Sequence, residues 1–171
     1  CWGYTFGWQN VDGFWPSGVP LITITPYGFW AFKKHWELTG SEKSKEICRS
    51  ISLFALQDLN KVEMPNGTIC SSYSPLDKRP VVNANTYRAA VLLESYQMFG
   101  GEEYVKEADE SIKFVLSYQE PDGKWFYEAI GDRDRFVDNF HTSFVLRNLY
   151  RAYQVNKNDE LLKAIKKGYD Y

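Results

Sequence analysis

Apolar residues recur at steps of three and four along most of this chain, beginning near residue 25. Ile47, Ile51 and Phe54 lie in one such stripe, and Ile112 and Val115 lie in another. This spacing places apolar side chains along one side of an α-helix. The pattern therefore predicts helices from residue 25 onward, joined by turns and loops.

The first 24 residues follow a different pattern. Large aromatic residues alternate with small or polar ones from Cys1 to Gln9, which is typical of an extended segment. Glycines and prolines between residues 13 and 20 then interrupt regular structure. We expect an ordered, aromatic-rich loop or short strand against a helical body. Its rings could either close one end of the core or line a ligand site.

Helix boundaries follow from the residues between the stripes. Thr25–Pro26 predicts a helix start, with a capping hydroxyl followed by proline in the first turn. Glycines end helices at residues 40 and 100, and Ser41 is the predicted cap of the second helix. The resulting units are an extended segment at 1–24 and helical hairpins at 25–60, 83–119 and 139–171.

The three hairpins look like copies of one unit. Thr25, Thr86 and Thr142 take equivalent places, roughly 60 residues apart. The first helix of each copy is apolar nearly all round and the second is charged on one face, which predicts an inner and an outer layer. The sequence thus predicts one all-α domain, an α/α toroid. A complete ring needs about twice as many hairpins, so we expect the rest from missing C-terminal sequence or another chain.

Composition limits the possible functions. Lys and Arg total 20 against 22 for Asp and Glu, so no nucleic-acid surface is expected. No apolar run of about 18 residues predicts a membrane span. Cys1, Cys48 and Cys70 match no zinc or disulfide pattern, so we expect free thiols, no metal, no cofactor and a cytoplasmic location. Because the chain begins at Cys1 rather than Met, we expect it to be a piece of a longer protein. The alternative that a signal peptide has been removed is left open.

The loops that enter the inner helices form the predicted site. Inner helices of a toroid start at one end, so residues 1–25, 60–85 and 119–141 would meet around the mouth of a central cavity. Aromatic residues make up 17% of the chain, and those in these loops could stack on a ligand. The positive ends of the inner helices would favour an anionic group such as a uronate or phosphate.

Glu128, Asp138 and His141 are the predicted acid–base residues. A carboxylate near a histidine can transfer protons, and two carboxylates across a sugar can hydrolyse a glycosidic bond. Asp138 also fits the N-cap of its helix, which the strength of cap preferences favours. His141 could equally hold a neighbouring loop.

The predicted substrate-binding residues bring aromatic rings or polar tips to the same loops. Asn83 and Asn85 could bond ligand hydroxyls, although capping of their helix explains them better. Arg88 lies one turn inside an apolar helix, where a charge needs a partner or an anionic ligand. The full set is Tyr4, Trp8, Gln9, Tyr73, Asn83, Asn85, Arg88, Trp125 and Tyr127.

Some of these residues resemble known families. Gln119-x-x-x-Gly123-x-Trp125 resembles the core of the QW repeat of terpenoid-cyclase and protein-prenyltransferase toroids. The aromatic-rich start, Asn83-Ala84-Asn85 and the run Asp138–Thr142 resemble α/α-toroid proteins encoded with polysaccharide-biosynthesis enzymes. That group is similar in fold to six-hairpin glycosidases and to the C-terminal domain of glucuronyl C5-epimerases. The resemblance implies the fold more firmly than the chemistry.

Three hypotheses about function compete. The leading one is a saccharide- or glycan-processing protein of polysaccharide biosynthesis or modification, acting as a hydrolase, epimerase or lyase if it is an enzyme. The second is an isoprenoid-handling toroid, which a dry apolar cavity would favour. The third is a non-catalytic helical scaffold whose mouth is closed by Trp2, Trp8 and Trp15. An open polar cavity with converging carboxylates would count against this scaffold.

Overall fold

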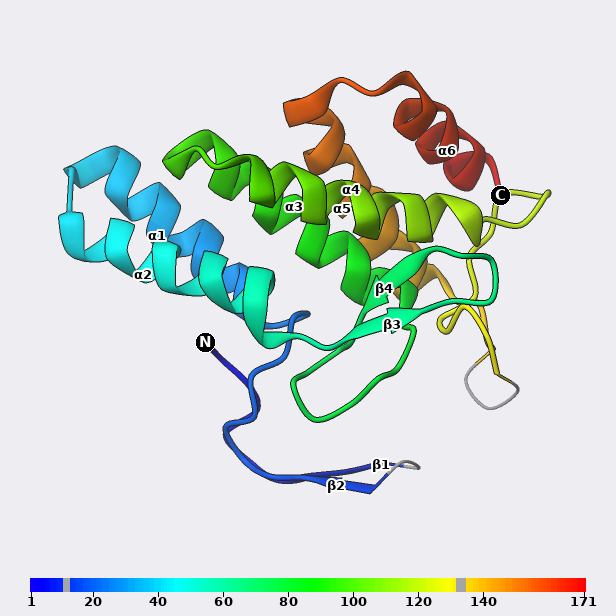
Figure 1. Cartoon of the computed structure of the whole chain (residues 1–171), viewed down its shortest axis with the longest axis horizontal. Helices are drawn as coiled ribbons and strands as arrows, with labels where there is room; N and C mark the ends of the chain where they lie inside the picture. Colours follow the sequence, from blue (N-terminus) through cyan, green and yellow to red (C-terminus); the bar gives the residue numbers. More distant parts are fainter. Residues whose placement is uncertain (11–12, 132–134) are drawn as a thin grey trace.

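The computed structural model describes residues 1–10, 13–131 and 135–171. In these ranges six α-helices pair into three hairpins (Figure 1). A π-helical segment, η1, continues the second helix. The bounds are α1 Thr25–Thr39, α2 Glu42–Leu53, η1 Phe54–Asp58, α3 Val82–Phe99, α4 Glu102–Ser117, α5 Asn139–Asn156 and α6 Asp159–Asp170.

Two short antiparallel strand pairs accompany the helices. β1 (Trp8–Asn10) pairs with β2 (Gly13–Trp15), so that the first residue of β1 lies opposite the last residue of β2. β3 (Lys61–Glu63) pairs with β4 (Ile69–Ser71) in the connection between α2 and α3. Figure 1 shows the β1–β2 hairpin set apart from the helices, below them in this view. The non-helical N-terminal segment is therefore as expected.

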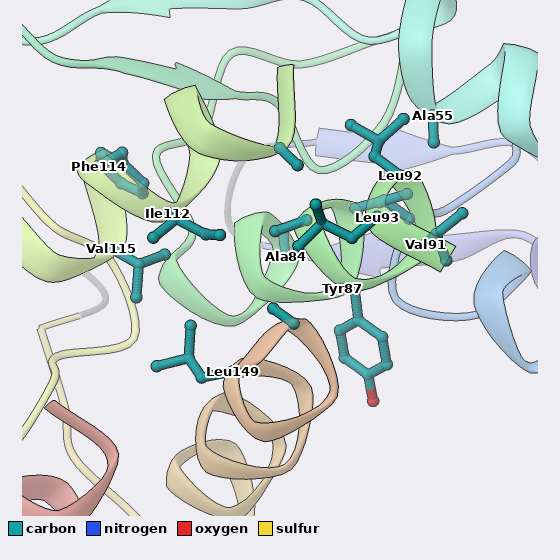
Figure 2. Packing of buried hydrophobic residues seen from close by; sticks show 14 of the residues in the cluster. Ala55, Ala84, Tyr87, Val91, Leu92, Leu93, Ile112, Phe114, Val115 and Leu149 are labelled. Atoms are coloured by element: carbon teal, nitrogen blue, oxygen red, sulfur yellow. The ribbon is translucent and has the colours of Figure 1, made fainter. Parts of the chain in front are cut away.

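Helix α3 is the centre of the core. It packs on α4 and on α5, and it also contacts α1 and α2. Its residues from Val82 to Ser95 are all buried, whereas α4 buries one stripe. Figure 2 shows α3, α4 and α5 each contributing to this core, with Ala84, Ile112 and Leu149 as examples. The prediction of a helix buried on all sides is confirmed for α3. It is wrong for α1 and α5, which pack on α3 but bury only one side, because no further helices cover their other sides in the described chain.

Two helix caps lie where the sequence places them. Ser41 caps α2, because its hydroxyl accepts a hydrogen bond from the amide of Ser44 at 3.4 Å. Asp138 caps α5, because its Oδ1 accepts from the amide of His141 at 2.6 Å. The structural explanation of Asp138 as a helix cap is therefore correct.

The capping predictions for α1 and α3 are wrong. Thr25 begins α1, but its hydroxyl donates to the carbonyl of Trp2 at 2.9 Å and accepts from the Trp2 amide at 3.0 Å. Helix α3 has no side-chain cap. Asn85 instead bonds the amide and carbonyl of Ser71, at 2.8 and 3.0 Å, and thereby fixes β4 against α3. In both cases a bond to a distant segment replaces the local cap.

The Gln119–Trp125 turn braces two hairpins. Gln119 Nε2 donates to the carbonyls of Gly123 and Ala164, both at 2.9 Å, while Trp125 Nε1 donates to a carbonyl of α4 at 2.9 Å. Gly123 has a φ of +103°, and a Cβ there would lie 2.2 Å from the carbonyl oxygen of Lys167. The turn therefore ties α4 to α6, and its glycine is required by this close approach.

The cysteines are free thiols, as expected, but they differ in exposure. Cys48 and Cys70 are buried, and Cys1 is exposed. Burial raises the pKa of Cys48 to about 11 and that of Cys70 to about 12, so neither thiol is activated as a nucleophile. Along the described chain, no helix is both long enough and apolar enough to cross a bilayer.

Candidate functional site

A cavity of about 370 Å³ opens where three loops meet, at the start of α5. We call it the mouth cavity. Its volume lies within the range of about 300–1,000 Å³ that is usual for small-molecule sites. The loops are the three that the sequence predicts to meet. The described lining residues are Tyr4, Trp8, Gln9, Trp15 and Leu21 from the N-terminal segment, Tyr73 and Arg79 from the second loop, and Tyr127, Phe136 and His141 from the third.

Stacked aromatic rings form much of the cavity wall. Tyr4 stacks on Trp8 with ring centroids 5.3 Å apart, and Tyr127 stacks on Phe136 at 4.9 Å. Burial raises the pKa of Tyr73 to about 12, so this phenol stays neutral. Such rings offer a flat apolar face together with a polar edge or tip. The wall is therefore suited to a ligand with both apolar and hydroxyl-bearing faces.

Main-chain hydrogen bonds join the three loops into one rim. The amide of Ile22 donates to the carbonyl of Tyr73 at 3.1 Å and links the first loop to the second. The amide of Val82 donates to the carbonyl of Tyr127 at 2.9 Å and links the second to the third. The amide of Tyr127 donates to the carbonyl of Phe136, also at 2.9 Å. The rings are thus positioned by backbone pairing between loops.

The second loop has its own internal anchor. The carboxylate of Asp77 accepts hydrogen bonds from the amides of Tyr73 and Arg79, both at 3.0 Å. Asn60 holds the same loop by donating to the carbonyls of Pro75 and Asp77, at 3.0 and 2.8 Å. Tyr73 and Arg79 therefore reach the cavity from a loop that is fixed at both ends.

His141 and Asp138 form a hydrogen-bonded pair at the cavity. His141 Nδ1 lies 2.7 Å from Asp138 Oδ2, and the imidazole packs edge-on against the ring of Tyr127 at 4.6 Å. Burial opposes ionisation of Asp138, but the bonds it accepts from the His141 amide and ring lower its pKa overall. An ionised carboxylate only accepts hydrogen bonds, so Nδ1 carries a proton and Nε2 is left for acid–base work in the neutral ring.

Glu128 and Arg79 form an ion pair in the wall of the same cavity. Arg79 Nε donates to Glu128 Oε1 at 2.6 Å, and both side chains are largely buried. The guanidinium also lies over the ring of Tyr127, 5.8 Å from its centroid. Arg79 lines the cavity, whereas Glu128 is not among the described lining residues. Glu128 therefore contacts a residue of the lining, Arg79, and helps to position it.

The structure brings together about half of the predicted site residues. Tyr4, Trp8, Gln9, Tyr73, Tyr127 and His141 line the mouth cavity. Asp138, Asn83 and Trp125 line a much smaller neighbouring pocket. Asn85 and Arg88 lie away from both and bond only to the protein's own groups in the described chain. Asp132, Arg133 and Asp134, which belong to the third loop, lie outside the described residues.

Four further described lining residues, Trp15, Leu21, Arg79 and Phe136, were not predicted to bind a ligand. The sequence predicted for Trp15 only that it closes the mouth, and it predicted no site role for Leu21, Arg79 or Phe136. Arg79 lies six residues after the predicted binding residue Tyr73 in a loop rich in proline and charge, which was the available signal. Its pairing with Glu128 joins residues far apart in sequence, so the sequence alone gave no reason to connect them.

The mouth is not closed as the scaffold hypothesis requires. Trp2 stacks against Phe32 of α1 at 6.0 Å and does not line the cavity. Trp8 and Trp15 form part of a wall around open space. The lining also carries polar groups from Gln9, Arg79 and His141. It is therefore neither filled nor purely apolar.

Comparison with known proteins identifies the fold of this chain through solved structures. No protein-family model matches this chain, and no curated protein matches it significantly in sequence. Among solved structures, the GH76 alpha-mannanase of Bacteroides thetaiotaomicron has a TM-score of 0.69 and 11% identity, covering 96% of this chain and 50% of the mannanase. A D-mannose isomerase has a TM-score of 0.65 and 12% identity over 97% of this chain and 45% of its own.

A third structure shows the same likeness. The unsaturated glucuronyl hydrolase of Bacillus sp. GL1 has a TM-score of 0.65 and 13% identity, covering 98% of this chain and 48% of the hydrolase. The chain has the α/α-toroid fold. This confirms the fold predicted from the helix pattern. The chain spans about half the length of these three toroids. At such identities the likeness establishes the fold and leaves the chemistry to the site.

Proposed function

We propose that the mouth cavity binds a saccharide and that the protein processes a sugar or glycan, in polysaccharide biosynthesis or modification. The observation that supports this is the cavity lining itself. Six aromatic side chains and the polar groups of Gln9, Arg79 and His141 surround about 370 Å³. A sugar ring matches such a lining, because its C–H faces pack on aromatic rings while its hydroxyls bond polar tips.

The fold neighbours add independent support for a saccharide ligand. Their names describe a mannanase, a mannose isomerase and a hydrolase that acts in glycosaminoglycan degradation. These are different reactions on related substrates, so they support the ligand class more than any one reaction. Fold analogy alone would be a weak argument. Here it agrees with the chemistry of the lining.

The proposed reaction centre is His141, held by Asp138. Hydrolysis by paired carboxylates needs two acidic groups facing the sugar. Among the described lining residues the acid–base group is His141, while Glu128 is bound to Arg79 and Asp138 to His141. A single positioned base suits a reaction that begins with proton transfer, such as epimerisation or elimination. We therefore place these two classes ahead of hydrolysis.

Binding can be tested by calorimetry and thermal unfolding with mannose, manno-oligosaccharides and uronic-acid disaccharides. A ligand that binds the folded state raises the unfolding temperature. Trp8→Ala should weaken binding by about tenfold, since it removes a ring from the wall. Tyr169→Ala, which removes an exposed ring from α6, is the matched control and should bind as the wild type does.

Catalysis is tested separately with His141→Gln, using the reducing-sugar, ultraviolet and NMR signals of hydrolysis, elimination and epimerisation. The proposal predicts lost turnover with binding retained. If none of these saccharides binds the wild type, or if Trp8→Ala binds as tightly as the wild type, the site is wrongly assigned.

A further inference from the structure

A second aromatic cluster surrounds Arg147 on the inner helices. The guanidinium lies 5.4 Å from the ring centroid of Tyr27, 5.6 Å from Trp30, 5.4 Å from Tyr87 and 5.2 Å from Phe144. These rings come from α1, α3 and α5. Figure 2 shows the Tyr87 ring pointing away from the core residues of α4. The cluster therefore lies on the inner face of the helical layer, away from the outer helices.

Arg147 is only partly satisfied by the protein. Its Nη2 donates to the hydroxyls of Tyr27 and Tyr87, at 3.1 and 2.8 Å. Its Nε is buried and has no hydrogen-bond partner in the part of the chain that the structure describes. Within the described residues Nη1 has no acceptor either. A guanidinium carries five N–H donors in a rigid fork. The two on Nη2 are used and the one on Nε is buried, so the two Nη1 donors are left for an acceptor outside the protein.

The two phenols leave one further donor. Their oxygens lie 2.8 Å apart, so one hydroxyl donates to the other. Tyr87 is only 1% exposed and must donate inside the protein, where the Tyr27 oxygen is its acceptor. The hydrogen bonds from Tyr87 and Arg147 lower the pKa of Tyr27 despite its partial burial, which fits Tyr27 as the acceptor. The hydroxyl hydrogen of Tyr27, a residue that is 45% exposed, therefore stays available to a ligand.

The charges around this cluster do not balance. Arg151 lies over the same Trp30 ring as Arg147, and Glu94 pairs with Arg151 and with Lys33. Glu94 binds Lys33 at 2.6 Å, Arg151 at 3.1 Å and the indole of Trp30 at 3.0 Å, and makes no contact with Arg147. Glu94 is thus shared by Lys33 and Arg151, and Arg147 has no carboxylate partner among the described residues. Such a surface attracts anions.

We propose that Arg147 and Tyr27 form an anion-binding site for a carboxylate or phosphate group carried by the saccharide ligand. Charge-assisted bonds from a guanidinium fork and a phenol are the strong type of hydrogen bond to such oxyanions. Phe144 connects the two places on α5, because its ring centroid lies 6.5 Å from that of His141 and 5.2 Å from the Arg147 guanidinium. A ligand that extends from the mouth past Phe144 would therefore reach Arg147. This inference rests on the proposed saccharide function and narrows it to acidic sugars.

The test compares ligands that differ in one group. D-glucuronate and D-glucose 6-phosphate are measured against D-glucose by calorimetry. The wild type should bind each acidic sugar about tenfold more tightly than glucose. The larger of the two affinity ratios, glucuronate to glucose or glucose 6-phosphate to glucose, shows whether the site prefers a carboxylate or a phosphate. Arg147→Gln should bring both ratios to about one, Arg147→Lys should keep part of them, and Tyr27→Phe should lower them about threefold.

Arg49→Gln is the matched control, because Arg49 also lies over an aromatic ring, that of Phe99, but on α2. It should leave the ratios unchanged. Equal binding of acidic and neutral sugars by the wild type, or a preference that survives in Arg147→Gln, overturns the anion site and leaves saccharide binding intact. If no sugar binds but inorganic phosphate quenches the wild-type tryptophan fluorescence and not that of Arg147→Gln, the anion site stands and the saccharide proposal fails.

Discussion

Arg88 on α3 and Arg147 on α5 are both arginines of inner helices, yet their surroundings are opposite. Arg88 is nearly buried, and its Nε, Nη1 and Nη2 all have acceptors, including the Glu107 carboxylate at 2.7 Å. Arg147 lies against four aromatic rings, two of which are phenols that accept its hydrogen bonds, and it has no acid partner within the described chain. The first is used entirely by the fold, and the second keeps donors for a ligand. An arginine on an apolar helix is therefore interpreted from its partners rather than its position.

Among the substitutions that test this comparison, Arg88→Gln is expected to cause the largest loss of stability. Arg88→Gln leaves the Glu107 carboxylate paired only with the more exposed Lys61, and it leaves the Ala55 carbonyl without its donor. Removing one member of a buried pair typically costs about 3–5 kcal/mol, and the remaining Lys61 pair places the expected loss at the lower end, about 3 kcal/mol. Urea unfolding should show this loss of stability, with Arg49→Gln as the control. A loss below about 1 kcal/mol would show that Arg88 is not the structural charge described here.

A smaller loss is expected at the ion pair behind the mouth cavity. Glu128→Gln removes the charge that Arg79 faces at 2.6 Å, in a region that is mostly shielded from solvent. We expect a loss of about 1–3 kcal/mol, because hydrogen bonds to charged groups contribute about this much. The matched control is Glu120→Gln, whose carboxylate is more exposed and lies 3.6 Å from Arg135. Similar effects of the two changes would remove the distinction between a wall pair and a surface pair.

The fold was predictable because its signals are local. The stripe of Ile47 and Ile51, the Ser41 cap and the Gly100 stop each depend on neighbours in sequence, and together they specify helices and layers. The caps assigned to Thr25 and Asn85 failed because both side chains bond segments far away in sequence. Local propensity does not contain such contacts.

The site residues likewise divide into those that the local sequence indicates and those that only the three-dimensional structure reveals. Trp8 and His141 could be predicted to line the mouth, because aromatic and titratable residues in or next to the segments that enter the inner helices are typical of ligand sites. Arg147 was missed because it lies in a helix whose apolar neighbours indicate a core. Tyr27 and Trp30 likewise looked like ordinary helix packing. Only the spatial arrangement shows that Arg88 has an acid partner and that Arg147 has none among the described residues.

Asp138 lies between these two extremes, because it has a charged partner in His141 but the pair is partly exposed to solvent. Asp138→Asn keeps a capping side chain and removes the charge. Because the folded state lowers the pKa of Asp138, its carboxylate stabilises the protein above the unfolded pKa of about 4. That contribution disappears as the pH falls through the lower folded pKa. The wild type should therefore be slightly more stable at neutral pH, by less than about 1 kcal/mol.

The measurement for Asp138 is thermal unfolding of both proteins between neutral and strongly acidic pH. The two unfolding temperatures should converge in acid. A difference that grows as the pH falls would have the wrong sign for this pair.

The smallest effect on stability is expected at Arg147, where the contrast with Arg88 is sharpest. Arg147→Gln loses cation–π contacts worth about 0.5–1 kcal/mol each at exposed sites. It also removes a charge whose buried Nε has no acceptor, and this relief offsets much of the loss. Urea unfolding should therefore show a change within about 1 kcal/mol, together with the loss of anion preference. If Arg147→Gln destabilised the protein as much as Arg88→Gln, both arginines would be structural, and the free donors of Arg147 would need another explanation than a ligand.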